Sequence, residues 1–294
     1  MRGSAVSAGS GPSTGSGSGT GSGSGTGSGS GTGSGSGTGS GSGIEVAGVT
    51  KRYGRAVVVD DVFFTLAPGG ITSIIGANGA GKSTLLSVMS RLLGADGGRV
   101  LVDGADVAAT PGDELARRLS ILRQDNHIAV RLTVRDLVAF GRYPYSKGRP
   151  SADDQAHVER ALAYLDLVPF ADRFLDQLSG GQRQRAFVAM VLCQDTDYVL
   201  LDEPLNNLDM AHSVSMMKLL RRAADELGKT VVLVIHDVNF ASFYSDRIIA
   251  LRHGALVRQG TPEEMMRPEI MREVFEVEVA IHEIDGKRVA VYFG

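Results

Sequence analysis

The sequence predicts an α/β fold that combines a parallel sheet, an antiparallel β part and an inserted helical part. Three observations support this prediction. Strand-like and helix-like segments alternate over residues 198–235, which is the pattern of a parallel sheet covered by helices. Strand-like segments pair across short turns within residues 44–66, 247–259 and 277–293, which indicates antiparallel pairing. Residues 132–176 instead follow a helical pattern and contain two helix-start signals.

A repetitive segment precedes the predicted fold. From Gly15 the hexapeptide GSGSGT repeats four times and breaks off within a fifth copy. This composition has almost no apolar surface to offset the entropy of ordering, so we expect residues 1–43 to be a disordered Gly/Ser/Thr linker. Its regularity is typical of an artificial linker, and a natural tether is the alternative. We therefore assign the folded domain to residues 44–294.

Composition excludes several classes of protein. The net charge of −3, without long basic runs, argues against a nucleic-acid binder. The single cysteine, Cys193, cannot form an internal disulfide, and its apolar helical surroundings favour a buried packing role over a reactive thiol. Every apolar run is shorter than the ~20 residues that cross a bilayer. We expect any membrane role to come through a partner.

The first half of the domain is predicted to begin with strands at residues 44–46 and 57–66, joined by a turn at Gly54. An apolar strand at 71–75 leads into a glycine-rich loop and a helix that we expect to end near Gly94. A strand at 99–102, a helix at 114–119 and a strand at 120–123 complete this half.

The second half begins with the inserted helical part, which we place at about residues 126–176. Capping boxes at Thr133 and Ser151 open two helices, and Pro169 is expected to end the second. Residues 143–150 between them are predicted to be an exposed loop. The remaining predicted elements are helices at 180–194 and 211–227, strands at 198–201 and 231–235, a strand pair at 247–251 and 255–259, and a C-terminal hairpin at 277–293 that turns at Asp285 and Gly286.

A phosphate-binding loop is the central motif of the chain. Residues 76–84 have the sequence GANGAGKST between an apolar strand and a helix, which is the context that G-x-x-x-x-G-K-[ST] requires. Its glycines allow backbone N–H groups to face phosphate oxygens, and the helix N-terminus adds positive charge. We expect Lys82 to contact the β- and γ-phosphates and Ser83 to ligate Mg²⁺. The segment predicts a nucleoside triphosphate site; a glycine-rich turn is the alternative.

Two carboxylates follow another apolar strand. Residues 198–204 have the sequence YVLLDEP, which places Asp202 and Glu203 at the carboxyl end of a buried strand, where open α/β sheets bind ligands. Asp202 suits Mg²⁺. Glu203 is placed to orient and deprotonate an attacking water. Ordinary surface acids are the alternative interpretation.

A second glycine motif is far more specific. Residues 178–185 have the sequence LSGGQRQR at the start of a helix. With this motif the chain resembles the ATP-binding subunits of ABC transporters over residues 44 to about 275. The resemblance implies a P-loop NTPase fold with a RecA-like parallel-sheet core, an antiparallel β subdomain and an inserted helical subdomain. It also implies a head-to-tail homodimer in which Ser179, Gly181 and Gln182 act on the ATP held by the partner's P-loop.

The resemblance assigns further residues. Tyr53 matches the aromatic residue that stacks on adenine, Gln124 matches the glutamine that senses Mg²⁺ and the γ-phosphate, and His236 matches the switch histidine. Purely structural roles are the alternatives for Tyr53 and His236. Asp209 belongs to the loop that crosses the dimer interface. The expected catalytic residues are Glu203, His236, Gln124 and Lys82, and the expected Mg²⁺ ligands are Ser83, Gln124 and Asp202. The expected ATP-binding residues are Tyr53, Gly76, Asn78, Gly79, Ala80, Gly81, Lys82, Ser83, Thr84, Ser179, Gly180, Gly181, Gln182 and Asp209.

Two positions depart from the pattern of many relatives. Ala77 occupies a P-loop position that is often proline, which should matter little because that side chain does not touch phosphate. Asn206 and Asn207 occupy interface-loop positions that are often serine and alanine or glycine. This second departure could alter communication between the two sites, but both are compatible with hydrolysis.

Segments around residues 121–145 and 190–209 are similar to the ATPases of iron–siderophore importers, most of all to the petrobactin (catecholate) type of Gram-positive bacteria. The resemblance implies uptake of a ferric siderophore with ATP and Mg²⁺, through permease subunits and indirectly a siderophore-binding lipoprotein, at the cytoplasmic face of the membrane. Residues 125–131 and 142–149 are candidates for the permease contact, with plain solvated loop as the alternative. A vitamin B12 or haem importer, a non-transport ATPase switch and a module that holds ATP without hydrolysing it remain open.

Overall fold

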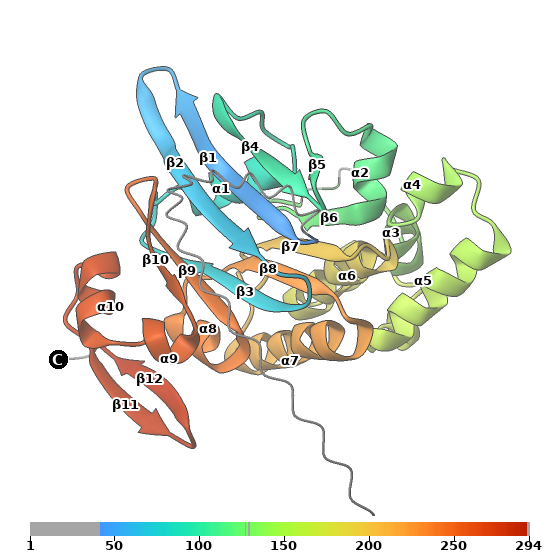
Figure 1. The fold of residues 1–294 in the computed structure, drawn as a ribbon. Coiled ribbons are helices and arrows are strands. Elements are labelled where there is room, and N and C mark those ends of the chain that lie inside the picture. Colours follow the sequence, from blue (N-terminus) through green and yellow to red (C-terminus); the bar gives the residue numbers. More distant parts are fainter. Residues whose placement is uncertain (1–41, 127, 129, 293–294) are drawn as a thin grey trace, which may run out of the picture. The chain divides into compact units, whose positions relative to one another are not determined.

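The computed structural model describes residues 42–126, 128 and 130–292. Most of the predicted linker at 1–43, residues 127 and 129 of a predicted permease contact, and residue 293 of the predicted hairpin therefore lie outside the described residues. The rest has the predicted α/β fold, with two larger sheets, a small hairpin and helices between and below them (Figure 1). No helix in this described part is both long enough and apolar enough to span a membrane.

The central sheet is buried on both faces. Its strands lie in the order β10 (Ala255–Gly260), β9 (Arg247–Arg252), β3 (Gly70–Ile75), β8 (Thr230–Val234), β7 (Tyr198–Asp202) and β6 (Leu119–Leu122). All neighbours except β9 and β10 are parallel. Side chains of β7 alternate between two cores: Val199 and Leu201 enter one, while Tyr198 and Leu200 enter the other. Burial on both faces explains why these strands are continuous apolar runs.

A second sheet is antiparallel, as predicted. Its order is β2 (Ala56–Leu66), β1 (Ile44–Tyr53), β4 (Gly97–Val102) and β5 (Ala105–Asp106). The helix α1 (Lys82–Met89) contacts strands of both sheets, and Figure 1 shows it between them. This helix is shorter than predicted. It ends at Met89 rather than near Gly94, because Ser90 leaves the helical conformation and Arg91 takes a left-handed φ of 59°.

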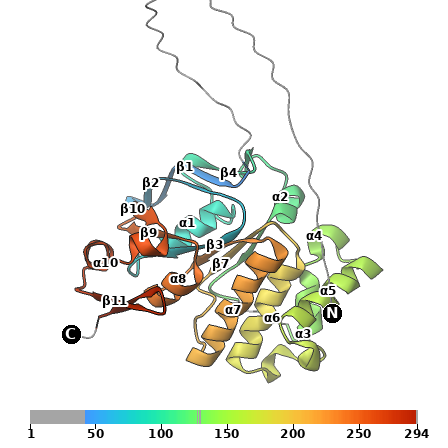
Figure 2. The ribbon, with the colours of Figure 1, turned by 60° about the horizontal axis from the view of Figure 1, so that its bottom comes forward.

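Helices cover the other face of the central sheet, where α6 (Gly180–Cys193) and α7 (Met210–Leu227) lie side by side in Figure 2. The inserted helical part packs on α6 and comprises α3 (Val134–Phe140), α4 (Tyr143–Ser146), α5 (Ala152–Tyr164) and two short 3₁₀ turns (Val168–Phe170 and Leu175–Gln177). Both predicted capping boxes are present, at Thr133 and Ser151. Cys193 is buried, as predicted, and burial raises the pKa of its thiol to about 12.

Two predictions in this region were wrong. The predicted loop at 143–150 contains α4, in which Pro144 occupies the first turn, where proline is tolerated. The helix α5 ends at Tyr164, before Pro169, because Asp166 turns the chain with a left-handed φ of 55°. Pro169 instead lies in the following 3₁₀ turn.

Four further helices among the described residues lie outside the helical part. The helix α2 (Gly112–Arg118) precedes β6 and corresponds to the predicted helix at 114–119. The helices α8 (Val238–Tyr244), α9 (Pro262–Met265) and α10 (Pro268–Phe275) were not predicted. The C-terminal hairpin of β11 (Ala280–Ile284) and β12 (Lys287–Val291) turns at Asp285 and Gly286, as predicted. It is held to α8 by Asn239, whose side chain pairs with both backbone groups of Ala290.

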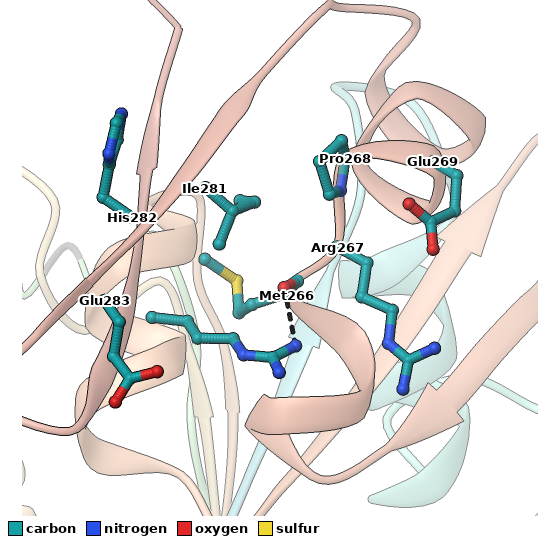
Figure 3. A pocket seen from close by; sticks show the side chains of 8 residues that line it. Met266, Arg267, Pro268, Glu269, Ile281, His282 and Glu283 are labelled. Carbon is teal, nitrogen blue, oxygen red and sulfur yellow. Dashed lines mark hydrogen bonds between the residues drawn. The ribbon is translucent and has the colours of Figure 1, made fainter.

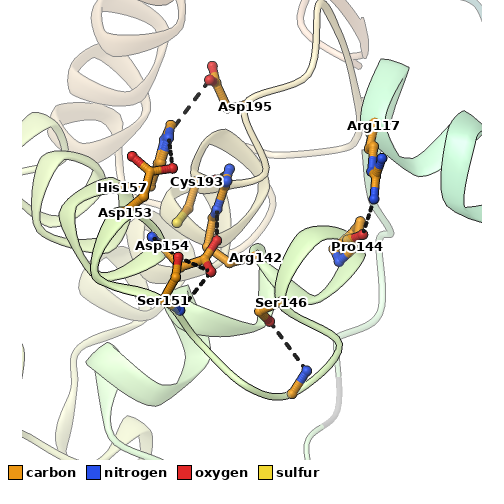
Figure 4. Close-up of polar contacts among 11 residues, drawn as sticks. Arg117, Arg142, Pro144, Ser146, Ser151, Asp153, Asp154, His157, Cys193 and Asp195 are labelled. Atoms are coloured by element: carbon orange, nitrogen blue, oxygen red, sulfur yellow. Dashed lines mark hydrogen bonds and ion pairs between the residues drawn. The ribbon is translucent and has the colours of Figure 1, made fainter.

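Arg142 links three helices of this region, α4, α5 and α6. It is 4% exposed, its Nε donates to Asp154 Oδ1 at 3.0 Å, and its Nη1 donates to the carbonyl of Cys193 at 3.2 Å (Figure 4). The guanidinium also stacks on Tyr145 of α4. The expectation that Arg142 belongs to an exposed permease contact is therefore wrong for this residue, because its charge is already bound inside the helical part.

Arg142→Ala is expected to lower the free energy of unfolding by about 3–5 kcal/mol, since it leaves Asp154 buried without its counter-charge. Hydrogen bonds from Ser151, together with Arg142, lower the pKa of Asp154 to about 2 from its ordinary 3.8. The contribution of Asp154 to stability is therefore complete above its unfolded pKa and is lost as pH falls toward 2. Urea denaturation of Arg142→Ala and of the exposed control Arg149→Ala, at neutral pH, is the test. Equal losses in both variants would contradict it.

Candidate nucleotide-binding site

The predicted phosphate-binding loop connects β3 to α1, and close backbone contacts require its glycines. Gly76 has a φ of 146°, and a Cβ there would lie 2.2 Å from the carbonyl oxygen of Leu251. Gly81 has a φ of 95°, and its Cβ would lie 2.4 Å from the carbonyl oxygen of Val58. The turn between β9 and β10 supports the loop as well, since Gly254 N–H donates to the Ala80 carbonyl at 3.2 Å. Side chains at Gly76 and Gly81 would therefore deform the loop.

Lys82 lies inside this loop rather than in solvent. It is 5% exposed, and its Nζ donates to the carbonyls of Gly76 at 2.9 Å and Ala77 at 3.0 Å. Burial lowers the pKa of Lys82, while the nearby carboxylates of Glu203 and Asp202 act in the opposite direction. The ammonium group is thus held at the loop by two neutral acceptors, which a triphosphate can replace with charged oxygens.

Ser83 and Asp202 meet at the carboxyl end of β7. The Ser83 hydroxyl donates to Asp202 Oδ1 at 2.8 Å, although the two residues are 119 positions apart. Burial raises the pKa of Asp202, and the Ser83 hydrogen bond lowers it. A hydroxyl and a carboxylate with the nearby amide of Gln124 form an all-oxygen donor set, which suits Mg²⁺ together with phosphate oxygens and water.

The carboxylate of Glu203 contacts two of the other predicted residues, Gln124 and His236. Gln124 Nε2 donates to Glu203 Oε2 at 2.8 Å, and His236 Nε2 lies 2.6 Å from Glu203 Oε1. The Glu203 side chain is 8% exposed, whereas the imidazole of His236 is 41% exposed. The three residues follow three adjacent strands, β6, β7 and β8, so the parallel sheet brings them to one edge.

These residues face a common cavity of about 440 Å³. Its lining is Val58, Asn78, Gly79, Ala80, Gly81, Lys82, Ser83, Thr84, Gln124, Glu203 and His236. Most of the predicted phosphate, Mg²⁺ and catalytic residues are therefore brought together. Val58 was not predicted, because nothing in the sequence indicated that β2 passes beside the loop. Tyr53 does not line this cavity; it lies at the end of β1 with 52% of its surface exposed.

The second glycine motif forms a separate surface. Ser179 caps α6, and its hydroxyl and backbone are paired with Gln182 in a capping box. Gly181 lies so close to the ring of His212 that a Cβ would be 2.4 Å from it. His212 is in turn held by Asp209, the cap of α7, at 2.7 Å. None of Ser179, Gly180, Gly181, Gln182 and Asp209 lines the cavity at the phosphate-binding loop of its own chain.

Another cavity, of about 350 Å³, lies between the start of α10 and the C-terminal hairpin (Figure 3). Its lining mixes both charges, with Arg267 and Arg288 beside Glu269 and Glu283. Arg288 is already bound to the carbonyl of Met266 at 3.3 Å. The cavity contains none of the predicted site residues, so the loop cavity is the candidate site.

Comparison with known proteins agrees with this geometry. The family model described as ABC transporter matches residues 59–206. Petrobactin import ATP-binding protein YclP of Bacillus subtilis (strain 168) is 55% identical over 250 residues, which cover 85% of this chain and 99% of that protein. Petrobactin import ATP-binding protein FatE of Bacillus anthracis is 49% identical, with 85% and 100% covered. A solved ATP-binding cassette, dimeric in a post-hydrolysis state with ADP and Pi, matches with a TM-score of 0.66 and 31% identity, covering 74% of this chain and 98% of that one.

Proposed function

Because the chain belongs to the ABC transporter family, we propose that it is the ATP-hydrolysing subunit of an importer that takes up a ferric siderophore. The observation that supports hydrolysis is the convergence of Lys82, Ser83, Gln124, Glu203 and His236 on one cavity. The observation that supports the substrate is the similarity to two petrobactin import ATP-binding proteins.

Binding of ATP begins at the phosphate-binding loop. The triphosphate takes the place of the Gly76 and Ala77 carbonyls at Lys82 Nζ, so the ammonium group turns from two neutral acceptors to the β- and γ-phosphates. Ser83, Asp202 and Gln124 would hold Mg²⁺. When bound, this ion supplies positive charge against the phosphate oxygens.

Hydrolysis is an in-line displacement on the γ-phosphate. The oxygen of a water forms a bond to the γ-phosphorus, the bond from that phosphorus to the β–γ bridging oxygen breaks, and ADP leaves with the bridging oxygen. Glu203 accepts a proton from the attacking water. His236 lies beside the same carboxylate and lines the same cavity, where it would contact the γ-phosphate. Lys82 stabilises the negative charge of the transferred group.

A second copy of the chain is required for a complete site in this proposal. The Ser179–Gln182 surface lies outside the cavity of its own chain, yet it presents backbone N–H groups at the start of α6, a geometry that suits anions. A head-to-tail homodimer places this surface on the partner's ATP. Permease subunits would dock on the helical part and hold the protein at the cytoplasmic face of the membrane, with a siderophore-binding lipoprotein acting through them.

Uptake of labelled ferric siderophore by source cells that lack this gene tests the proposal. Cells complemented with the wild-type gene are expected to regain uptake, and cells complemented with Glu203→Gln are not. Labelled cobalamin and labelled haem are measured in the same strains. If the cells that lack the gene lose cobalamin or haem uptake but keep iron-chelate uptake, the protein belongs to that other importer branch. If uptake of all three compounds is unchanged, an ATPase switch outside transport is favoured.

A further inference from the structure

The turn after β7 contains a contact that neither the motif pattern nor the comparisons assign. Asn206 N–H donates to the Glu203 carbonyl at 3.2 Å, which closes a four-residue turn. Glu203 itself has a left-handed φ of 52°. This backbone conformation is uncommon for a residue other than glycine. The Asn206 amide is then placed to donate from Nδ2 to Glu203 Oε2.

Among the residues that the structure describes, the Glu203 carboxylate has three polar partners. His236 contacts Oε1, while Gln124 and Asn206 share Oε2. The side chain is thereby fixed at both oxygens, in a surrounding that leaves it 8% exposed.

The three partners of Glu203 differ in whether they leave it when ATP binds. Under the proposed function, on which this inference rests, Gln124 turns to Mg²⁺ and His236 turns to the γ-phosphate. Both approach Glu203 from other strands, 79 and 33 positions away in the sequence, so each can leave without moving the base. Asn206 lies three positions from Glu203 in the same closed turn, and it moves with the base.

We propose that Asn206 is a positioning residue for the catalytic base: its amide keeps Glu203 Oε2 in place and leaves Oε1 to face the attacking water. An amide is long enough for this contact, whereas a serine hydroxyl, one bond closer to the backbone, is not. A carboxylate at the same position would remove the donor and repel Glu203. Because a displacement of about 1 Å at a reacting group can cost about 10²-fold in rate, loss of this hydrogen bond should be visible in turnover.

Steady-state ATP hydrolysis by the full chain tests the proposal. We expect Asn206→Asp to lower kcat by about 10–10²-fold and Asn206→Ser to lower it by about 10-fold, while KM for ATP changes less than about twofold, because Asn206 touches the base rather than the nucleotide. A residue that merely maintained the fold would reduce ATP binding together with turnover.

Asn206→Leu is the matched comparison. Leucine has nearly the volume of asparagine, adds no charge and cannot donate a hydrogen bond to Glu203 Oε2. This variant is expected to lower kcat by about 10-fold, as Asn206→Ser does, which separates the lost hydrogen bond from a general effect of negative charge near ATP.

The double variant Glu203→Gln with Asn206→Asp completes the cycle. Since Asn206 acts through Glu203, the double variant should hydrolyse ATP no more slowly than Glu203→Gln alone. The proposal is overturned if Asn206→Asp or Asn206→Leu keeps wild-type kcat, or if the losses from Glu203→Gln and Asn206→Asp multiply in the double variant. In each case Glu203-dependent hydrolysis by the wild type would leave the proposed function standing. Wild-type hydrolysis that does not depend on Glu203 would contradict both the role of Asn206 and the proposed mechanism of hydrolysis.

Discussion

Glu203→Gln is expected to lower kcat for ATP hydrolysis by about 10²–10⁴-fold, the range that a general base contributes, and to leave ATP binding close to wild type. Glutamine has nearly the shape of glutamate, so packing at this buried position is preserved. It cannot accept the proton of the attacking water, and this is the step that the substitution removes. Phosphate release and the binding of a fluorescent ATP analogue measure the two effects separately.

The same variant is expected to accumulate as a closed dimer with Mg²⁺ and ATP, because ATP that holds two copies together is no longer consumed. Size-exclusion chromatography with and without ATP measures this shift. Glu226→Gln is the control, since Glu226 is an exposed acid on α7 paired with Arg222 and lies outside the cavity. Wild-type turnover by Glu203→Gln would contradict the assignment of the base and with it the proposed mechanism.

The fold class could be predicted from sequence because its signals are local. Apolar strands at residues 71–75, 198–201 and 231–235 are buried on both faces and stand out as continuous runs, and the capping boxes at Thr133 and Ser151 mark helix starts in neighbouring residues. Element ends were predicted less well. The helices α1 and α5 end close to left-handed residues, Arg91 and Asp166. Arginine and aspartate also occur inside helices, so neither residue type marks a helix end in the sequence.

The candidate site could be predicted as a set of residues but not as a set of contacts. The spacing of the glycines around Lys82 is a property of a short motif, whereas the carbonyls that hold Lys82 Nζ depend on how the loop folds. Asn206 was noted for its residue type, and its contact with Glu203 follows from a turn geometry that only the structure contains. Arg142 illustrates the opposite error, since a charged residue beside an expected loop was taken as exposed although Asp154 neutralises it inside the helical part.

Gly180→Asp is expected to lower kcat by about 10²-fold or more without unfolding the chain, because in the proposed dimer it changes the partner's site and not its own. Gly180 is exposed at the start of α6, and an added Cβ would meet its nearest atom, the Asn207 carbonyl oxygen, at an ordinary 3.5 Å. An aspartate in the first turn of a helix is favourable for the helix dipole. Facing a triphosphate across a dimer, however, it repels the phosphate groups. The isolated chain should therefore bind ATP normally and fail to form a productive dimer.

A mixing experiment separates this arrangement from a site complete within one chain. Lys82→Ala removes the lysine that we propose binds phosphate and keeps the Ser179–Gln182 surface, while Gly180→Asp changes that surface and keeps Lys82. Each variant alone should be nearly inactive. In a hybrid dimer, one site combines the intact loop of Gly180→Asp with the intact surface of Lys82→Ala, and random pairing of equal amounts should restore about one quarter of wild-type turnover. A mixture that remains as inactive as its components would contradict the composite site. If each chain contained a whole site, each variant would keep its own defect after mixing and no active site would form.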